Sequence, residues 1–141
     1  MGLENFHKQL GETMMFCQCI EHDIKLIYSG MLEGNFDHNY SSVETDTLGT
    51  IIRKLEKLDE SDGNPYFGKA DYSLLKEITE IRNYWAHQGY IDFIYRGIYS
   101  NEYNNQVHRL KKDYGRLKNL HEISEKVRLE FFGINENEDD D

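Results

Sequence analysis

The chain has 141 residues, of which 16 are basic and 26 are acidic, so its formal net charge is −10. This balance argues against binding of nucleic acid through bulk positive charge, and 38% hydrophobic residues with a single proline argue against a disordered chain. We expect one globular domain at residues 1–132. The first residues lack the pattern of a signal peptide, and no apolar run approaches the ~20 residues that span a bilayer, which favours a cytoplasmic protein that does not contact a membrane.

The first predicted helix carries apolar side chains every three or four positions from Leu3 to Met31, and Gly30 and Gly34 are its candidate stop signals. At 1.5 Å per residue this helix is about 40 Å long. A second stripe lies about 160° round the helix from the first. It consists of Met15, Cys19, His22 and Leu26. Because both stripes need to be buried, the second requires another helix or a second subunit.

Residues 35–42 read as a loop before the second predicted helix. Ser41 and Glu44 have the spacing of a capping box, which places the start of that helix near Ser41. Its apolar stripe is Leu48, Ile51 or Ile52, Leu55 and Leu58. The glycines and the proline in residues 59–71 then indicate a connection.

The third predicted helix begins near Asp71 and has a core arc at helical spacing. That arc is Leu74, Ile78, Ile81 and Trp85. Residues 90–103 are aromatic and ambiguous, and a continuation of the helix followed by a loop is one interpretation of them. A fourth helix from about Asn104 has an apolar stripe from Val107 to Val127. The economical fold is therefore an all-α, antiparallel four-helix bundle of the up-and-down type.

The end of the chain is acidic. Residues 129–141 contain six acidic side chains and no basic one, and we expect residues 133–141 to form an acidic disordered tail. Such a tail either aids solubility alone, or folds back on the basic segment at residues 96–128 and competes there with an anionic ligand.

No metal site or cofactor is predicted from the sequence. Cys17 and Cys19 point about 200° apart on a helix, so they cannot share a metal ion. The sequence also contains no glycine-rich phosphate loop, no nucleophile elbow and no HExxH helix.

A group of polar side chains late in the third predicted helix is the candidate reaction site. Asn83, His87 and Tyr90, at spacing 4 and 3, fall on a polar stripe opposite the core arc. Arg82 lies between the two arcs, and its long side chain can turn toward either. These residue types suit attack of an RNA 2′-hydroxyl on its own phosphate without a metal. The imidazole, with a reference pKa near ~6.5, moves protons, the guanidinium holds the phosphate, and the amide orients either group.

Positions five apart on a helix diverge by about 140°, so Arg82 and His87 of one chain would hold a single phosphate poorly. Two copies of the chain, related by a two-fold axis, would place both pairs around one cleft. The second stripe on the first helix is an independent reason to expect a homodimer.

The pattern Arg82-Asn83-x-x-x-His87, late in the third helix of a small bundle, resembles the signature of the HEPN superfamily. The resemblance implies a metal-independent endoribonuclease with a composite site at a homodimer interface, of the kind found in toxin–antitoxin, abortive-infection and antiviral defence systems. It implies Arg82 and His87 as the catalytic pair, Asn83 as the polar position, and an antitoxin or regulatory protein as a candidate partner. One subgroup has a tyrosine two residues after the histidine, where this chain has Gly89. Tyr90 follows one residue later as an auxiliary candidate. The alternative function is a non-catalytic HEPN-like interaction module.

Basic side chains on the fourth predicted helix are candidates for binding the RNA substrate. Arg109, Lys112 and Arg116 share a face, with Lys111 and Lys118 beside them. The alternative is an ordinary solvated face. Three tyrosines in the preceding aromatic segment either stack on unpaired bases or pack against the bundle, namely Tyr95, Tyr99 and Tyr103.

Overall fold

The computed structural model describes residues 1–61 and 63–133, and in these residues it contains five α-helices and no β-strand. The helices are α1 (Leu3–Met31), α2 (Phe36–Glu44), α3 (Leu48–Glu60), α4 (Lys69–His87) and α5 (Asn101–Phe131). The predicted all-α class is therefore confirmed. Within the described part of the chain, no helix has the length and the apolar character needed to cross a membrane. The predicted acidic tail, apart from Gly133, lies outside the described residues.

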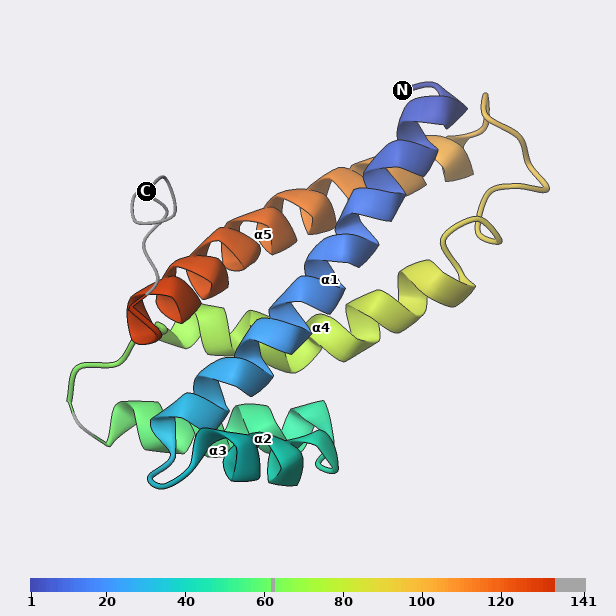
Figure 1. Ribbon diagram of the computed structural model, residues 1–141. Coiled ribbons are helices and arrows are strands. Elements are labelled where there is room, and N and C mark those ends of the chain that lie inside the picture. The colour runs from blue at the N-terminus through green and yellow to red at the C-terminus, as the bar shows by residue number, and fades with distance from the viewer. Residues whose placement is uncertain (62, 134–141) are drawn as a thin grey trace, which may run out of the picture.

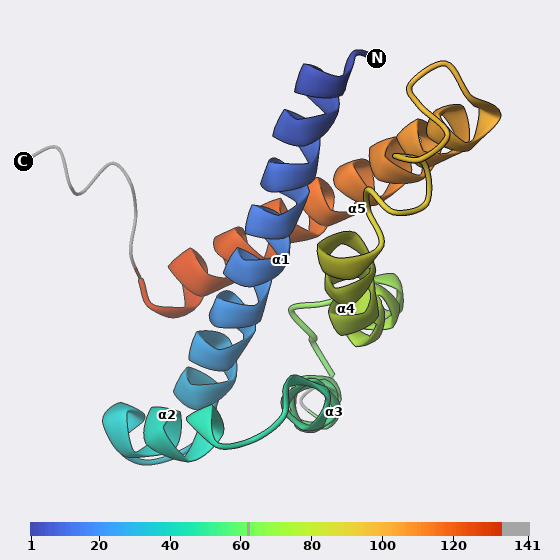
Figure 2. The same cartoon turned by 90° about the vertical axis from the view of Figure 1, so that its right-hand side faces the viewer.

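The two longest helices, α1 and α5, run in the same direction and cross each other (Figures 1 and 2). Near their starts, the Tyr103 hydroxyl donates a hydrogen bond to the carbonyl of Met1 at 2.7 Å. Near their ends, the Ser124 hydroxyl lies 3.3 Å from a carboxylate oxygen of Asp23. Early residues of α5 thus pair with early residues of α1, and late residues with late ones. The up-and-down prediction, which requires antiparallel first and last helices, is wrong on this point.

The cause is the pair of short helices α2 and α3, which both pack against one end of α1 (Figure 1). At the start of α2, the Phe36 ring contacts the Phe132 ring at the end of α5. After α3, the Tyr66 ring contacts the ring of Phe131, the residue before Phe132. This pair of helices therefore leaves and returns to the end of the molecule where α1 finishes. From there α4 runs back antiparallel to α1. The next helix, α5, reverses direction again and therefore runs parallel to α1 (Figures 1 and 2).

The sequence prediction merged part of α2 with α3 and placed the start of that helix wrongly. Ser41 and Glu44 lie inside α2, which begins earlier because the Asn35 side chain accepts a hydrogen bond from the His38 amide at 3.1 Å. The predicted loop at residues 35–42 is therefore mostly helical. The chain has five helices in its described part, where we predicted four.

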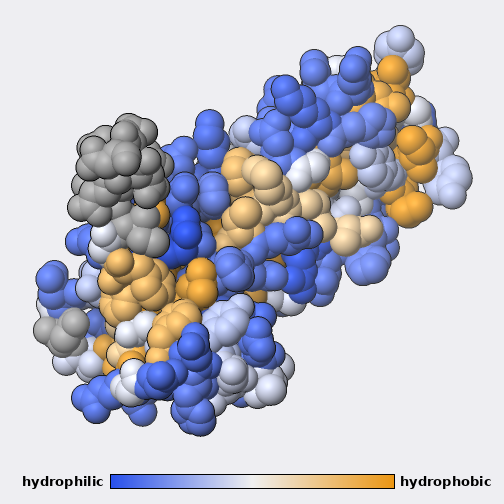
Figure 3. Space-filling model, viewed as in Figure 1, coloured by the Kyte–Doolittle hydropathy of each residue, from blue (hydrophilic) through white to orange (hydrophobic). Residues whose placement is uncertain are grey.

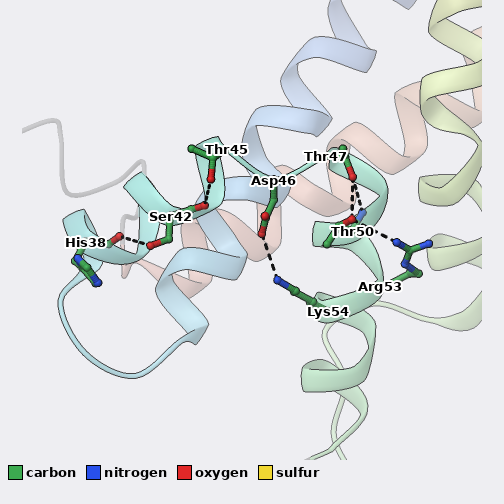
Figure 4. A network of polar contacts seen from close by, with 8 residues as sticks. All are labelled: His38, Ser42, Thr45, Asp46, Thr47, Thr50, Arg53 and Lys54. Atoms are coloured by element: carbon green, nitrogen blue, oxygen red, sulfur yellow. Dashed lines mark hydrogen bonds and ion pairs between the residues drawn. The ribbon is translucent and has the colours of Figure 1, made fainter.

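The break between α2 and α3 is stabilised by polar contacts (Figure 4). The Thr47 hydroxyl accepts a hydrogen bond from the Thr50 amide at 3.3 Å and so caps α3. Lys54 of α3 forms an ion pair with Asp46 in the turn, with 3.3 Å between nitrogen and oxygen. The first backbone N–H groups of a helix have no partner within that helix, and the Thr47 cap supplies a partner for one of them at the start of α3.

Two buried clusters make up the core. The larger one lies between α1, α2, α3, α4 and the second half of α5. The smaller one, at the end of the molecule where α1 and α5 begin, consists of Phe6, Leu10, Trp85, Phe93, Tyr103, Val107 and Leu110. Ile81 packs against both clusters. The predicted core arc of the third helix is confirmed, since Leu74, Ile78 and Trp85 are buried.

The boundaries of the last two helices fix the segment that joins them. α4 ends at His87, and residues 88–100 form a series of turns before α5 begins at Asn101. The Ser100 hydroxyl caps α5 by accepting a hydrogen bond from the Tyr103 amide at 3.1 Å. The buried Phe93 anchors the middle of this segment to the smaller cluster. Residues 90–103 therefore do not continue α4.

Candidate functional site

His87 is the last residue of α4, and its side chain is exposed. The backbone immediately after it is tightly packed. A Cβ atom on Gly89 would lie 2.8 Å from the carbonyl oxygen of Trp85, which is too close for a real side chain. From α5, the Gln106 side chain donates a hydrogen bond to the carbonyl of Gly89 at 2.9 Å. The end of the helix that carries His87 is thus held in place by α5.

Trp85 fixes the same turn of α4 from the core side. Its indole nitrogen donates a hydrogen bond to the buried carboxylate of Asp113 at 2.8 Å. Its ring meets the Phe6 ring edge-on, with 6.4 Å between centroids. Because the tryptophan is buried between α1 and α5, the orientation of the last turn of α4, and with it the outward direction of His87, follows from core packing.

Arg82 turns toward α1, which settles the direction that the sequence left open. Its Nη1 atom lies 2.5 Å from both carboxylate oxygens of Glu21. The arginine side chain is 33% exposed and the glutamate side chain 16%. Burial raises the pKa of the Glu21 carboxyl, and the positive charge of Arg82 opposes that rise. Arg82, which the sequence predicts to be catalytic, therefore joins α4 to α1.

Arg82 and His87 are not brought together within one chain. Five helical positions separate their directions by about 140°. Arg82 faces α1, whereas Tyr84, one turn before His87, faces α5. Asn83 is exposed between them.

Tyr90 lies beyond the end of α4 and does not continue the polar stripe of Asn83 and His87, so that part of the stripe prediction is wrong. Its hydroxyl is 2.6 Å from Nδ1 of His7, and its ring meets the Phe6 ring at 5.7 Å. Burial raises the pKa of the Tyr90 phenol. The side chain thus belongs to the contact with the start of α1.

The five cations predicted to bind RNA divide into two groups. The two arginines contact α4. Arg109 lies over the ring of Tyr84, with its Cζ 3.3 Å from the ring centroid, and Arg116 pairs with Glu77 at 2.8 Å. The lysines Lys111, Lys112 and Lys118 are exposed. These five side chains therefore form a mixed surface, in which the arginines contact α4 and the lysines are exposed to solvent.

The three tyrosines of the aromatic segment also divide. Tyr103 is 3% exposed and belongs to the core, whereas Tyr95 and Tyr99 are 85% and 96% exposed. Exposed isoleucines accompany them in the same segment, at Ile91, Ile94 and Ile98. Such exposure of large rings in a segment anchored by a buried phenylalanine is not explained by folding.

Tyr84 and Glu21 are site residues that the sequence analysis did not identify. The available signal for Tyr84 was its position three residues before His87, which makes the two side chains neighbours on the helix surface. Glu21 lies 61 positions from Arg82 in the chain, so no local pattern links them.

The described residues offer no other obvious centre of chemistry. Among them, no group of three or more His, Cys, Asp or Glu side chains is close enough to hold a metal ion. An open cavity of about 280 Å³ lies between α1 and α5 and is lined by Met1, Asn5, Lys8, Gln9, Glu12 and Tyr114.

Comparisons of the chain with protein-family models, with curated proteins and with solved structures give no match.

Proposed function

We propose that the protein is a cytoplasmic, metal-independent endoribonuclease of the HEPN type, and that two copies of the chain form its active site. The observation that carries the proposal is an exposed imidazole, His87, on a rigidly held helix end one and a half turns after Arg82. We also assign the arrangement of α1, α4 and α5, with the short helices α2 and α3, to a HEPN-like bundle. A role as a toxin or defence protein, countered by an antitoxin or another regulatory protein, belongs to the same proposal.

The chemistry needs proton transfer at two oxygens. One copy of His87 accepts the proton of the RNA 2′-hydroxyl while the 2′-oxygen attacks the adjacent phosphorus. The bond from phosphorus to the 5′-oxygen breaks, and the other copy of His87 donates a proton to that leaving oxygen. The products are a 2′,3′-cyclic phosphate and a 5′-hydroxyl. Solvent exposure of His87 supports this role, because both the substrate and exchangeable protons can reach the ring.

Arg82 supplies positive charge for the pentacovalent transition state. Its pair with Glu21 uses Nη1, and no ion pair with another described residue engages Nε or Nη2. The remaining N–H groups are thus available to a phosphate, while Glu21 holds the side chain in one orientation. Asn83, exposed next to Arg82, is the orienting amide.

The outer face of α1 supports a homodimer. Its second apolar stripe faces away from the core, with Met15 48% exposed and Cys19 and Leu26 half-buried. Figure 3 shows apolar surface over the middle of α1, on the face turned to the viewer. Burying this stripe against its symmetry mate would satisfy the apolar surface that one chain leaves uncovered.

The test is cleavage of an unstructured RNA by the purified protein in the presence of a metal chelator. We expect products with 2′,3′-cyclic phosphate or 3′-phosphate ends. We expect no cleavage of the same oligonucleotide with a single 2′-deoxy substitution at the scissile nucleotide. A requirement for Mg²⁺, or equal cleavage of DNA, would exclude the roles assigned to His87 and Arg82.

A second candidate function, a non-catalytic interaction module, is favoured by the exposed apolar side chains of residues 88–100. In that case the segment is a docking surface for a partner protein, and Arg82 has only its structural contact with Glu21. The two functions are separated by the same cleavage assay, since an interaction module leaves every RNA intact.

A further inference from the structure

Three arginines lie on α4 or contact it from α5, and they differ in the group that balances their charge. Arg82 pairs with Glu21, and Arg116 pairs with Glu77. Arg109 is exposed and forms no ion pair with any described residue. Its guanidinium instead lies 3.3 Å from the centroid of the Tyr84 ring. A stacked guanidinium keeps its in-plane N–H groups free, and these are the donors that bind a phosphate bidentately.

The ring beneath Arg109 is itself held in place. The Tyr84 hydroxyl is 2.5 Å from a carboxylate oxygen of Asp92 and 3.0 Å from the side-chain oxygen of Gln106. The ring also meets Trp85 edge-on, with 5.0 Å between centroids. Because Tyr84 is tied to α5 and to the segment after α4, it presents one fixed surface on which Arg109 rests.

Tyr84 and His87 are three residues apart on α4 and are therefore neighbours on its surface. Helical side chains in general lean toward the N-terminus of their helix, which from His87 is the direction of Tyr84. Arg109 thus lies on the same side of α4 as His87. Arg82 is about 160° away from Tyr84 round the helix and faces α1.

We propose that Arg109 binds a phosphate of the RNA strand next to His87 of the same protomer, and that Tyr84 is the positioning residue that holds Arg109 there. This assignment rests on the proposed function and extends it. Arg82 acts at the scissile phosphate from the composite site, whereas Arg109 fixes the strand on the His87 side. A phosphate-binding role also gives a reason for the stacking of this exposed arginine on a tyrosine, in an acidic chain with many carboxylates that could have paired with it.

The experiment compares Arg109→Ala and Arg109→Lys with the wild type in steady-state cleavage of a short unstructured RNA. We expect Arg109→Ala to lower kcat/KM by about tenfold or more, and Arg109→Lys to restore only part of it, because a lysine carries the charge but not the planar fork. The matched control is Arg53→Ala. Arg53 is an exposed arginine of α3 that bonds only the Thr50 hydroxyl among the described residues, and it should leave kcat/KM unchanged.

Binding is measured separately on the His87→Ala protein, which does not cut. Fluorescence anisotropy of a labelled RNA across a salt series gives the slope of the logarithm of the affinity against the logarithm of the salt concentration. Arg109→Ala should reduce the magnitude of this slope by about one, because one phosphate contact is lost. Arg53→Ala should leave that slope unchanged. An unchanged slope together with kcat/KM within twofold of the wild type would show that Arg109 only packs on Tyr84.

Tyr84 is tested through Arg109. Tyr84→Phe keeps the ring and should retain most of the activity, whereas Tyr84→Leu should lose about as much as Arg109→Ala. In the Arg109→Ala background, Tyr84→Leu should cause no further loss, and an additive loss would overturn the positioning role. If the wild type binds RNA with an Arg109-dependent slope but does not cut, the phosphate site stands and the nuclease proposal falls. If it neither binds nor cuts RNA, both fall.

Discussion

The guanidinium of Arg82 and the carboxylate of Glu21 join α4 to α1 through both carboxylate oxygens. This contact has two consequences for the proposed chemistry. It fixes the orientation of the arginine before any substrate arrives, which lowers the entropic cost of holding a phosphate. It also places a competing negative charge beside the arginine, so the charge state of Glu21 controls how strongly Arg82 attracts an anion.

The Glu21 pair gives a prediction for the pH dependence of stability. Burial raises the pKa of this carboxyl above its ordinary value of 4.5, so the folded chain holds a proton at pH values where the unfolded chain has lost it. The contribution of Glu21 to stability therefore falls as pH rises from that value through the raised pKa. Glu21→Gln does not titrate. The free energy of unfolding of the wild type minus that of the variant should decline over this range and then stay level.

Urea denaturation at a series of pH values measures this difference directly. The difference between a neutral Glu21 carboxyl and the Gln amide shifts the whole curve by a constant, whereas burial and the attraction to Arg82 both act through the pKa of Glu21 and so set the slope. A difference that rises with pH would mean that the attraction to Arg82 outweighs burial, and that the pKa of Glu21 is lowered in the folded chain.

Gly89 gives a prediction for the end of α4. In Gly89→Ala, the new methyl group meets the carbonyl of Trp85 at 2.8 Å, so the helix end has to shift. We expect the free energy of unfolding to fall by about 1–3 kcal/mol and cleavage to weaken because His87 moves. The control is Gly115→Ala in α5, where a Cβ meets nothing within 4 Å and should stabilise the chain by about 0.5–1 kcal/mol. Equal effects of the two substitutions in chemical denaturation would contradict the tight packing at Gly89.

The exposed tyrosines give a prediction about binding alone. Tyr95→Ala and Tyr99→Ala should each change the free energy of unfolding by less than about 0.5 kcal/mol, because both rings are almost fully exposed. If the rings stack on unpaired bases, each substitution weakens binding of single-stranded RNA to the His87→Ala protein by about 1–3 kcal/mol, and phenylalanine restores it. Tyr103→Ala, in the core, should instead destabilise the fold by about 3–5 kcal/mol. Unchanged RNA affinity in both exposed variants would assign the segment to a protein partner.

Much of the fold could be predicted from local patterns. The apolar spacing from Leu3 to Met31 predicted the helix α1, and the core arc around Trp85 predicted the buried face of α4, because a helix has to bury one face. The division into α2 and α3 was missed because Ser41 and Glu44 imitate a capping box inside α2, whereas the true cap of α3 is Thr47. The parallel course of α1 and α5 depends on this pair of short helices, so no local pattern reveals it.

The candidate site was predictable only in its residue types. The spacing of Arg82 and His87 on one helix follows from the sequence, and so does the outward position of His87. The direction of Arg82 depends on Glu21, and the place of Arg109 depends on Tyr84. Both are contacts between helices that are distant in the chain, and they exist only once the helices have packed.

The outer face of α1 gives a prediction for assembly. Light scattering of the wild type should give about twice the mass of one chain. Met15→Lys places a charge in the centre of the exposed stripe and should yield single chains without cleavage activity. The control is Ile91→Lys, since Ile91 is 50% exposed against 48% for Met15 but lies in the segment after α4. A dimer that survives Met15→Lys would place the interface elsewhere, and a wild type that is monomeric at micromolar concentration would remove the composite site.

The most direct test of the central claim is the cleavage rate of His87→Ala beside that of His108→Ala, in a metal chelator. Both histidines are exposed, one at the end of α4 and the other on α5, so neither substitution should alter Tm or the mass of the assembly. Loss of a general acid–base group removes about 10²-fold or more of the rate, whereas His108→Ala should cut RNA as the wild type does. Full activity of His87→Ala, or an equal loss in both variants, would contradict the assignment of the reaction to this helix end.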